Sequence, residues 1–385
     1  MKVLYLIDTL EMGGSEQSLL SILSRFKKIK PLVCHVYPGE TLKPAFEAAG
    51  IPVISLNVPG RYNFHRAIGQ VTKLLRAEQP GLLHTTLFRA DVIGRTAGRL
   101  ARIPVLSSFI NEPYHPDRWA TISTTRQLKL KAVQLIDRLT ARWACHFIAV
   151  SEPTRAANCR ALDIPPEKVT VIYRGRDPLP FLTVSAQARH HRRLALGLPL
   201  KALILLNVAR LLQRKGQNEL IQAMPLVLQK FPQAQLLIAG EGHDRPMLET
   251  TIEELGLAKA VRLLGRRDDV PELLHLADLF VFPSYYEGHP GSLVEAMLAA
   301  KPIVASDIPV HREAIVDRET GRLVPARNPQ AIAQGIIWML EHSVEAERMG
   351  VQAQQTALER FQIDQIAAQH EALYEKLSRA NARHR

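Results

Sequence analysis

Two glutamates bracket a short loop whose composition predicts a ligand site. Glu287 and Glu295 are the first and last residues of EGHPGSLVE, a stretch that contains two glycines and a proline. Because proline does not fit inside a helix, Glu287 precedes the helix that we predict around Ser292. A carboxylate accepts hydrogen bonds from hydroxyl groups. We therefore expect Glu287 to hold a neutral hydroxylated group and Glu295, one turn into the helix, to hold a vicinal diol such as a ribose.

The same loop leads into a helix N-terminus. Gly291, Ser292 and Leu293 stand at its predicted start, where free backbone amides and the helix dipole favour a phosphate. Carboxylates around hydroxyls and amides around phosphates together predict a sugar–diphosphate–nucleoside ligand. A structural alternative stays open for Glu295, because Ser292 and Glu295 also have the spacing of a capping box.

Two basic residues can meet the diphosphate from a second loop. Arg210 ends a predicted strand and Lys215 precedes the next predicted helix, so both lie at one strand–loop–helix turn. There they can converge on a diphosphate, since both donate charged hydrogen bonds. The sequence has no Asp-x-Asp to hold a divalent cation. We therefore expect Arg210, Lys215 and backbone amides to stabilise the leaving group without a metal.

Glycines follow two further predicted strands. Gly13 and Gly14 come after the first strand, and Gly240 follows a strand in the second half of the chain. Glycines at such junctions let backbone amides approach an anion at a helix start. The first pair does not have the pattern G-x-G-x-x-G, so the sequence does not favour a dinucleotide-binding oxidoreductase.

Strands and helices alternate along the chain and must position these residues. Short aliphatic runs flanked by Gly or Pro alternate with longer segments of helical periodicity, such as 64–76 and 89–102. This alternation predicts parallel sheets with helices on both faces and ligands at the carboxyl ends of the strands. We predict strands at 3–8, 32–37, 53–56, 82–85, 105–109, 147–151 and 169–173, and again at 203–209, 235–239, 261–264, 279–283 and 303–306.

The alternation of strands and helices stops once along the chain and then restarts, which predicts two doubly wound α/β domains. At 385 residues the chain is also too long for one ordinary core. We expect an N-terminal Rossmann-like domain at 1–180, a linker at 181–200, a C-terminal Rossmann-like domain that binds the nucleotide at 201–360, and a terminal segment at 361–385.

Composition places the chain among soluble globular proteins, with 46% hydrophobic and 22% charged residues. The first apolar run reaches Asp8 too soon for a signal peptide, and no apolar run approaches the length of a membrane span. Three widely spaced cysteines, Cys34, Cys145 and Cys159, fit neither a disulfide framework nor a metal knuckle. These features favour a reducing cytoplasm.

The net charge of +12 is concentrated in the first half of the chain. Residues 1–182 contain 25 Lys and Arg against 14 Asp and Glu. In the segment 126–142, basic residues interleave with leucines at helical spacing, which is typical of a solvated helix face or of a helix on an anionic membrane. Aromatic residues are only 6% of the chain, so we do not expect a nucleic-acid partner.

The chain resembles the group 1 (family four) glycosyltransferases over nearly its whole length. The resemblance is strongest from 203 to 325, and its most specific element is E-x7-E. It is carried by NVARLLQRKGQNELIQAM, LLIAGEG, VRLLGRRDDV and ADLFVFPSYYEGHPGSLVEAMLAAKPIVASDIPVHREAIVDRETGRLVP. It implies the GT-B fold: two Rossmann-like α/β domains facing across a cleft, with a last helix, about 362–377, that crosses back to the first domain.

The resemblance also implies roles in binding and catalysis. In the family the first glutamate of E-x7-E contacts the hydroxyls of the donor sugar and the second contacts the ribose. By this match Glu287, Arg210 and Lys215 are the catalytic candidates, while Gly13, Gly14, Gly240, Arg266, Gly291, Ser292, Leu293 and Glu295 are the candidates for binding the nucleotide sugar.

The acceptor side departs from the family pattern. The family often places a histidine after the fifth strand of the first domain, near the reacting carbon. Here the matching positions hold Ile110, Asn111 or Glu112, and His115 comes later. We take Asn111, Glu112 and His115 as acceptor-side candidates. His84 and His289 could also touch a ligand, although we favour a structural role for each.

Together these features predict a retaining glycosyltransferase. It would move a hexosyl unit from a nucleotide sugar, with a UDP-sugar favoured over a GDP-sugar, and would need neither a metal nor another cofactor. The acceptor would be a lipid-linked or envelope glycan, reached in the cytoplasm or on the inner face of the cytoplasmic membrane. The alternatives are a GT-B epimerase and a transferase with a soluble small-molecule acceptor.

Overall fold

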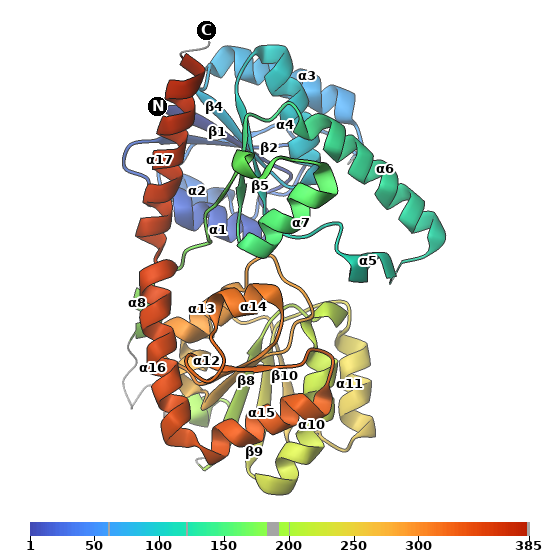
Figure 1. The fold of residues 1–385 in the computed structure, drawn as a ribbon, viewed down its shortest axis with the longest axis vertical. Helices are drawn as coiled ribbons and strands as arrows, with labels where there is room; N and C mark the ends of the chain where they lie inside the picture. Colours follow the sequence, from blue (N-terminus) through green and yellow to red (C-terminus); the bar gives the residue numbers. More distant parts are fainter. Residues whose placement is uncertain (61, 121, 183–191, 200, 383–385) are drawn as a thin grey trace. The chain divides into compact units, whose positions relative to one another are not determined.

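The computed structural model describes residues 1–60, 62–120, 122–182, 192–199 and 201–382 (Figure 1). They form two compact units: the first contains Met1–Gly175 and the chain from Ile363 on, and the second contains Arg176–Gln362. The second unit begins earlier than predicted, because the short helix Leu179–Leu182 (α8) packs on helices of that unit. Half of the predicted linker, 181–200, lies outside the described residues, namely 183–191 and 200.

The first unit is built on a seven-stranded parallel sheet of order β3-β2-β1-β4-β5-β6-β7. The order reverses between β1 and β4, and such a sheet binds ligands at the carboxyl ends of the strands on either side of the reversal. The strands are Lys2–Ile7 (β1), Lys30–His35 (β2), Val53–Ser55 (β3), Leu82–Thr86 (β4), Val105–Phe109 (β5), His146–Ala149 (β6) and Val169–Val171 (β7).

Both faces of this sheet are buried. Successive residues of β1 alternate between two hydrophobic clusters: Val3, Tyr5 and Ile7 belong to one, and Leu4 and Leu6 to the other. A strand buried on both sides reads as a continuous apolar run, which is the signal in the sequence. The covering helices are Gly14–Leu23 (α1), Lys43–Ala48 (α2), Phe64–Glu78 (α3), Phe88–Ala101 (α4), Pro116–Ala120 (α5), Thr124–Ala141 (α6), Glu152–Leu162 (α7) and Ile363–Ala382 (α17), with a 3-10 turn at Pro166–Lys168 (η1).

The last helix, α17, belongs to the first unit, as the fold family predicts. Its residues Ile363, Ile366 and Tyr374 lie in the same hydrophobic cluster as Val3 of β1. The carboxylate of Glu371 accepts hydrogen bonds from the three consecutive amides of 27–29, at 2.9, 2.6 and 2.9 Å. Apolar contacts to β1 and hydrogen bonds to the backbone of 27–29 therefore hold this helix on the first unit.

A buried hydrogen-bonded group joins α17 to the sheet. The hydroxyl of Tyr374 lies 2.8 Å from Nδ1 of His84, 3.0 Å from Nδ1 of His370 and 2.9 Å from the Tyr5 hydroxyl. The other ring nitrogen of His84 lies 2.6 Å from Oγ of Ser108. Burial lowers the pKa of His84 and lowers the pKa of His370 to about 4. His84 is thus a neutral histidine with both nitrogens engaged, which fits the structural role favoured above.

The second unit contains a six-stranded parallel sheet of order β10-β9-β8-β11-β12-β13. Here the order reverses between β8 and β11. The strand β13 was not predicted, because it has only three residues, begins with an arginine and follows a glycine. The strands are Leu203–Val208 (β8), Ala234–Ala239 (β9), Val261–Gly265 (β10), Leu279–Phe282 (β11), Ile303–Ser306 (β12) and Arg322–Val324 (β13).

The helices of this unit bury an aliphatic cluster against the sheet. They are Gln217–Lys230 (α10), Arg245–Glu254 (α11), Val270–Leu276 (α12), Gly291–Leu298 (α13), Pro309–Ala314 (α14), Pro329–Glu341 (α15) and Ser343–Arg360 (α16), with a 3-10 turn at Gln213–Lys215 (η2). None of the helices in the described parts of either unit is long and apolar enough to cross a membrane.

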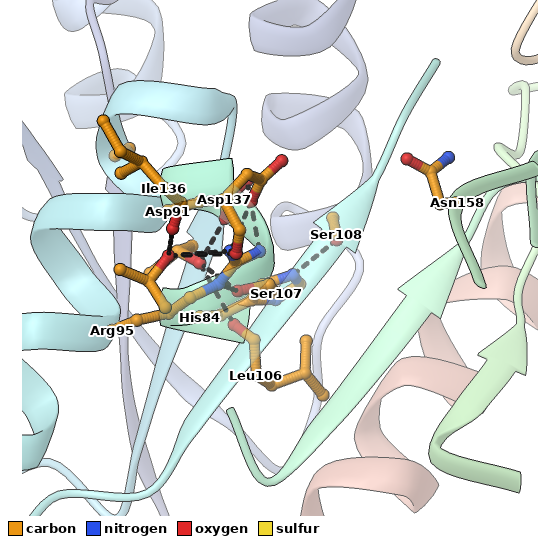
Figure 2. Close-up of polar contacts among 12 residues, drawn as sticks. His84, Asp91, Arg95, Leu106, Ser107, Ser108, Ile136, Asp137 and Asn158 are labelled. Atoms are coloured by element: carbon orange, nitrogen blue, oxygen red, sulfur yellow. Dashed lines mark hydrogen bonds and ion pairs between the residues drawn. The ribbon is translucent and has the colours of Figure 1, made fainter. Parts of the chain in front are cut away.

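A buried arginine ties α6 to the first sheet (Figure 2). Arg95 of α4 is fully buried. Its guanidinium lies 2.6 Å from a carboxylate oxygen of Asp137 on α6 and 3.7 Å from one of Asp91, and it donates to Ser107 of β5 at 2.9 Å. The second oxygen of Asp137 accepts from the Tyr114 hydroxyl at 2.8 Å. Polar contacts to Arg95 and Tyr114 therefore add to the apolar contacts of Leu130 and Ala141 in attaching the helix to the unit.

The outward face of α6 is apolar as well as basic. Leu128, Leu135 and Leu139 are 64%, 57% and 48% exposed, whereas Asp137 and Thr140 are buried. Usually the leucines of an amphipathic helix face the core. Here they lie on the same exposed surface as Lys129, Lys131 and Arg138. We call this surface, made by the exposed residues of 126–142, the α6 face.

Candidate active site

Lys215 and Glu287 meet at the carboxyl edge of the second sheet. Lys215 ends η2, which follows β8, and Glu287 lies in the loop after β11. These two strands are the neighbours at which the strand order reverses. The ammonium group of Lys215 donates to Oε1 of Glu287, and Nη1 of Arg214 lies 3.2 Å from Oε2. Each oxygen of the carboxylate therefore has a cationic partner.

Gly216 permits this close approach. Its φ is +70°, and a Cβ atom at this position would lie 2.2 Å from the carbonyl oxygen of Pro283, directly after β11. Only glycine tolerates both the backbone conformation and the contact. The turn between η2 and α10 therefore packs on the chain that leaves β11, which brings Lys215 beside Glu287.

Glu287 is buried and ionised beside Lys215. Glu287 is 6% exposed. Burial alone would raise the pKa of Glu287, but Lys215 and Arg214 outweigh this effect and lower the pKa to about 2. Burial lowers the pKa of Lys215; Arg214 and Arg210 add to the lowering, while Glu287 opposes it. Glu287 is thus a fixed hydrogen-bond acceptor at neutral pH and not a proton donor.

Arg210 lies in the same loop, and this residue is exposed. Its carbonyl oxygen accepts from the side chain of Gln217 at 3.0 Å, which fixes the loop before α10. Among the described residues no carboxylate pairs with its guanidinium, yet its charge reaches Lys215 and lowers the pKa there. This loop thus brings three basic residues, Arg210, Arg214 and Lys215, to the side of the sheet where the buried carboxylate of Glu287 lies. Arg214 was missed as a contact of Glu287, because only the fold brings residues 73 positions apart together.

Glu295 does not form the capping box that its spacing allows. The helix α13 begins at Gly291 with Pro290 as its N-cap, and no side chain caps it. Instead Oε1 of Glu295 accepts from Nε of Arg176 at 2.6 Å. The capping alternative is therefore wrong, because Ser292 lies inside the helix and not at its cap. The free amides at this N-terminus belong to the first turn, which includes Ser292 and the buried Leu293.

Loops after β8, β9 and β10 meet beside this site. Gly240 has φ +150°, and a Cβ atom there would lie 1.9 Å from the carbonyl oxygen of Ala209. Its amide donates to the carbonyl of Gly265 at 2.8 Å, and Arg266 follows directly as an exposed residue. Gly240 and Arg266, both candidates for binding the nucleotide sugar, are therefore close to each other and to the loop of Arg210.

In the first unit, Gly13 is the N-cap of α1 and Gly14 is its first residue. A Cβ atom at Gly13 would clash with the carboxylate of Glu16, at 2.3 Å, whereas one at Gly14 would meet nothing within 4 Å. Gly14 therefore leaves the backbone at this helix start open to close approach.

A cavity of about 260 Å³ lies in the first unit around the carboxyl ends of β1, β4 and β5. Its polar lining includes Asp8, Arg89, Asn111, Arg118 and Asn158. Asp8 accepts from the amide of Ala90 at 2.9 Å and from Arg89 at 3.0 Å; burial raises the pKa of Asp8, against the effect of Arg89. Leu87, also in the lining, has φ +80°, an unfavourable conformation for leucine of the kind that clusters at functional sites.

Of the acceptor-side candidates, Asn111 lines this cavity. Glu112 and His115 follow Asn111 in the sequence, and their side chains lie near each other. The Glu112 carboxylate is 3.9 Å from Nε2 of His115. Burial raises the pKa of Glu112 to about 7, with Arg160 opposing the shift. Asp8 and Asn158 were not predicted, because a lone Asp after a strand and an Asn within a helix carry no motif. His289, within the E-x7-E loop, packs edge-on against Phe361.

Two family models match the chain. "Glycosyl transferases group 1" matches residues 189–356, and "Glycosyl transferase 4-like domain" matches residues 13–175. The first match contains Arg210, Lys215, Glu287 and Glu295, and the second contains Gly13 and the candidates of the acceptor side.

Known proteins are similar over most of the chain. The uncharacterized glycosyltransferase MJ1607 of Methanocaldococcus jannaschii is 28% identical over 78% of this chain and 76% of its own length. The UDP-Gal:alpha-D-GlcNAc-diphosphoundecaprenol alpha-1,3-galactosyltransferase of Escherichia coli is 26% identical over 61% of this chain, which spans 60% of that protein. The crystal structure of Anabaena HepE in complex with UDP-glucose matches with a TM-score of 0.84 and 26% identity, over 97% of this chain and 100% of that one.

Proposed function

The chain is a group 1 glycosyltransferase of the GT-B fold that uses a nucleotide-sugar donor, and we propose that it moves a hexosyl unit from a UDP-sugar to a hydroxyl acceptor with retention and without a metal. The observation that carries the proposal is the buried Glu287 carboxylate, held ionised by Lys215 and Arg214 where the strand order of the second sheet reverses. The family models and the named relatives are transferases, which does not favour the epimerase alternative.

Different residues of the site would bind different parts of the donor. Glu287 accepts hydrogen bonds from the sugar hydroxyls, and Glu295 accepts from the ribose. Arg210, Lys215 and the free amides of the first turn of α13, which includes Ser292 and Leu293, bind the diphosphate, whose negative charge grows as the bond to the sugar breaks. The Gly291 amide itself already donates to the carbonyl of His289 at 3.0 Å. Gly240 and Arg266 lie beside the base. The UDP-glucose and UDP complexes of HepE support a uridine nucleotide.

In the proposed reaction the acceptor attacks from the face that the nucleotide leaves. The bond between the anomeric carbon and the diphosphate oxygen breaks as the bond to the acceptor oxygen forms. The acceptor proton passes to an oxygen of the departing diphosphate. The products are the glycoside, with its anomeric configuration unchanged, and the nucleoside diphosphate. Glu287 is a binding group in this scheme, because Lys215 and Arg214 already engage both of its oxygens.

Metal-free retention is directly testable. With a UDP-hexose donor and an acceptor that is turned over, we expect initial rates to be the same with and without excess EDTA. We also expect the product to keep the anomeric configuration of the donor. Proton NMR of the product at early times measures the anomeric coupling. Activity that EDTA removes and manganese restores, or a product of inverted configuration, would contradict the proposal.

We further propose that the acceptor is lipid-linked and is reached at the inner face of the cytoplasmic membrane. The lipid-linked acceptor in the name of the E. coli relative supports this view, as does the α6 face, where leucines and basic residues are exposed together. Each Lys or Arg near an anionic surface contributes about 1 kcal/mol, so a few would give reversible attachment. The cavity lined by Asp8 and Asn111 offers hydroxyl-binding groups to the acceptor glycan.

Vesicle binding tests the membrane proposal. The protein should co-sediment with vesicles of anionic lipid at low salt, less at high salt, and not with neutral vesicles. Charge reversal at Lys129, Lys131 and Arg138 should reduce binding at least tenfold, since each charge contributes about 1 kcal/mol. Reversal at Lys73, an exposed residue of α3 in the same unit that is not part of the α6 face, is the control. Equal and negligible binding to both kinds of vesicle would mean a soluble acceptor.

A further inference from the structure

Arg176 is fixed at both ends. Its amide donates to the carbonyl oxygen of Phe361 at 2.8 Å, and the residue forms a bridge with Gln362 at the end of the second unit. Its side chain reaches Glu295, where Nε donates to Oε1 at 2.6 Å. The two side chains are 24% and 18% exposed, so the pair is partly withdrawn from water. A short, charge-assisted bond in such a setting holds a side chain in one geometry.

The guanidinium lies against the N-terminus of α13. A Cβ atom on Gly291 would come within 2.1 Å of one of its terminal nitrogens. The N-terminus of a helix carries partial positive charge, so a cation there is not favoured by the helix itself. The bond to Glu295 offsets this unfavourable placement. Gly291, which has no side chain, leaves the space that the guanidinium needs.

The bond engages only one oxygen of the Glu295 carboxylate. Within the described parts of the chain, Oε2 has no hydrogen-bond partner, and no other cation pairs with the carboxylate. A carboxylate held through one oxygen presents the other in a fixed direction. A vicinal diol donates two hydrogen bonds, and a fixed acceptor binds it without first losing side-chain entropy.

We propose that Arg176 is a positioning residue that orients Glu295 and thereby sets the preference of the site for a ribose over a 2′-deoxyribose. This inference rests on the proposed role of Glu295 as the ribose ligand. In this inference Arg176 acts through the Glu295 carboxylate, to which its Nε donates. Its contribution should therefore depend on the hydroxyl groups of the ribose and not on the diphosphate.

Calorimetric titration of the full-length protein with UDP and with 2′-deoxy-UDP tests the inference. We expect the wild type to bind UDP about tenfold more tightly, as one hydrogen bond to a charged group allows. Arg176→Ala should lose most of this tenfold preference, with the affinity for 2′-deoxy-UDP changed less than twofold. Arg176→Lys, which can still pair with Glu295, should recover part of it. Arg312→Ala is the control, because Arg312 forms a similar pair with Asp307 in the same unit.

Two further variants separate this inference from the proposed function. Glu295→Ala should lose the same preference, and Arg176→Ala combined with Glu295→Ala should be no worse than Glu295→Ala alone. If Glu295→Ala keeps the preference, the ribose role of Glu295 fails. If Glu295→Ala loses it while Arg176→Ala keeps it, only the role of Arg176 fails. Tighter UDP binding by Arg176→Ala, or an equal loss for both nucleotides, would also overturn the positioning role. Thermal unfolding of each variant checks that it is folded.

Discussion

Replacement of Lys215 by methionine is expected to lower kcat/KM for the nucleotide sugar by roughly a hundredfold and to destabilise the second unit by about 3–5 kcal/mol. Lys215 donates directly to the buried carboxylate of Glu287. Methionine keeps much of the volume and removes the charge, so Glu287 loses one of its two cationic partners and its pKa should rise. Steady-state kinetics and denaturant unfolding measure the two effects.

Two further variants test whether loss of the Lys215–Glu287 pair causes both the lower kcat/KM and the lower stability. Lys230→Met removes the exposed ion pair with Glu341 in the same unit, where the loss should stay within about 0.5 kcal/mol. Lys215→Met combined with Glu287→Gln replaces the charged pair by neutral groups, so it should recover much of the stability without recovering the activity. If Lys215→Met retained full kcat/KM, the diphosphate role of Lys215 would be wrong. If it were as stable as Lys230→Met, the buried pair would not matter for folding.

Replacement of Asp137 by alanine is expected to cost the first unit about 3–5 kcal/mol, because it leaves the buried guanidinium of Arg95 without its shortest carboxylate contact. Asp91 cannot fully compensate. It lies 3.7 Å away, and burial raises its pKa to about 6 despite the nearby Arg95, so ionising it there is costly. The Tyr114 hydroxyl also loses its acceptor. Chemical denaturation followed by circular dichroism gives the free energy of unfolding.

The matched control is Asp163→Asn, which removes the exposed charge that pairs with Arg138 at 2.7 Å. Asparagine also tolerates the left-handed backbone at this position, where φ is +58°. The free energy of unfolding should therefore change little. Arg95→Met in the Asp137→Ala background removes the stranded charge and should restore part of the loss. A loss for Asp137→Ala no larger than that for Asp163→Asn would show that α6 is held by other contacts.

The fold was predictable because its signals are local. Both ends of β5 and β12 coincide with their predicted bounds, and most other strands differ by one or two residues. These strands are aliphatic runs buried on both faces, a pattern visible without knowledge of the neighbouring elements. The three residues of β13 show no such run, since an edge strand of this length depends on the sheet that it joins.

The candidate site was predictable only in part. The sequence singled out Glu287 and Lys215 because glycines, proline and charges at strand ends are typical of a ligand loop. Their direct pairing was not foreseen, and Arg176 was missed, since it lies 119 positions from Glu295 in the chain. The buried Arg95 looked like any helical arginine. Contacts of this kind depend on which elements become neighbours in the sheet order, and the sequence of a single element does not contain that information.

The position of α17 in the chain has a consequence for synthesis. This helix supplies Tyr374 and Glu371 to the first unit, but it follows the whole second unit in sequence. Domains generally fold as units while the chain emerges from the ribosome, the N-terminal one first. In this protein the second unit is translated in full before α17 appears. The surface around Tyr5 and the amides of 27–29 therefore stays uncovered during that interval, and a chain released early, at Gln362, would carry one complete unit and one that lacks its closing helix.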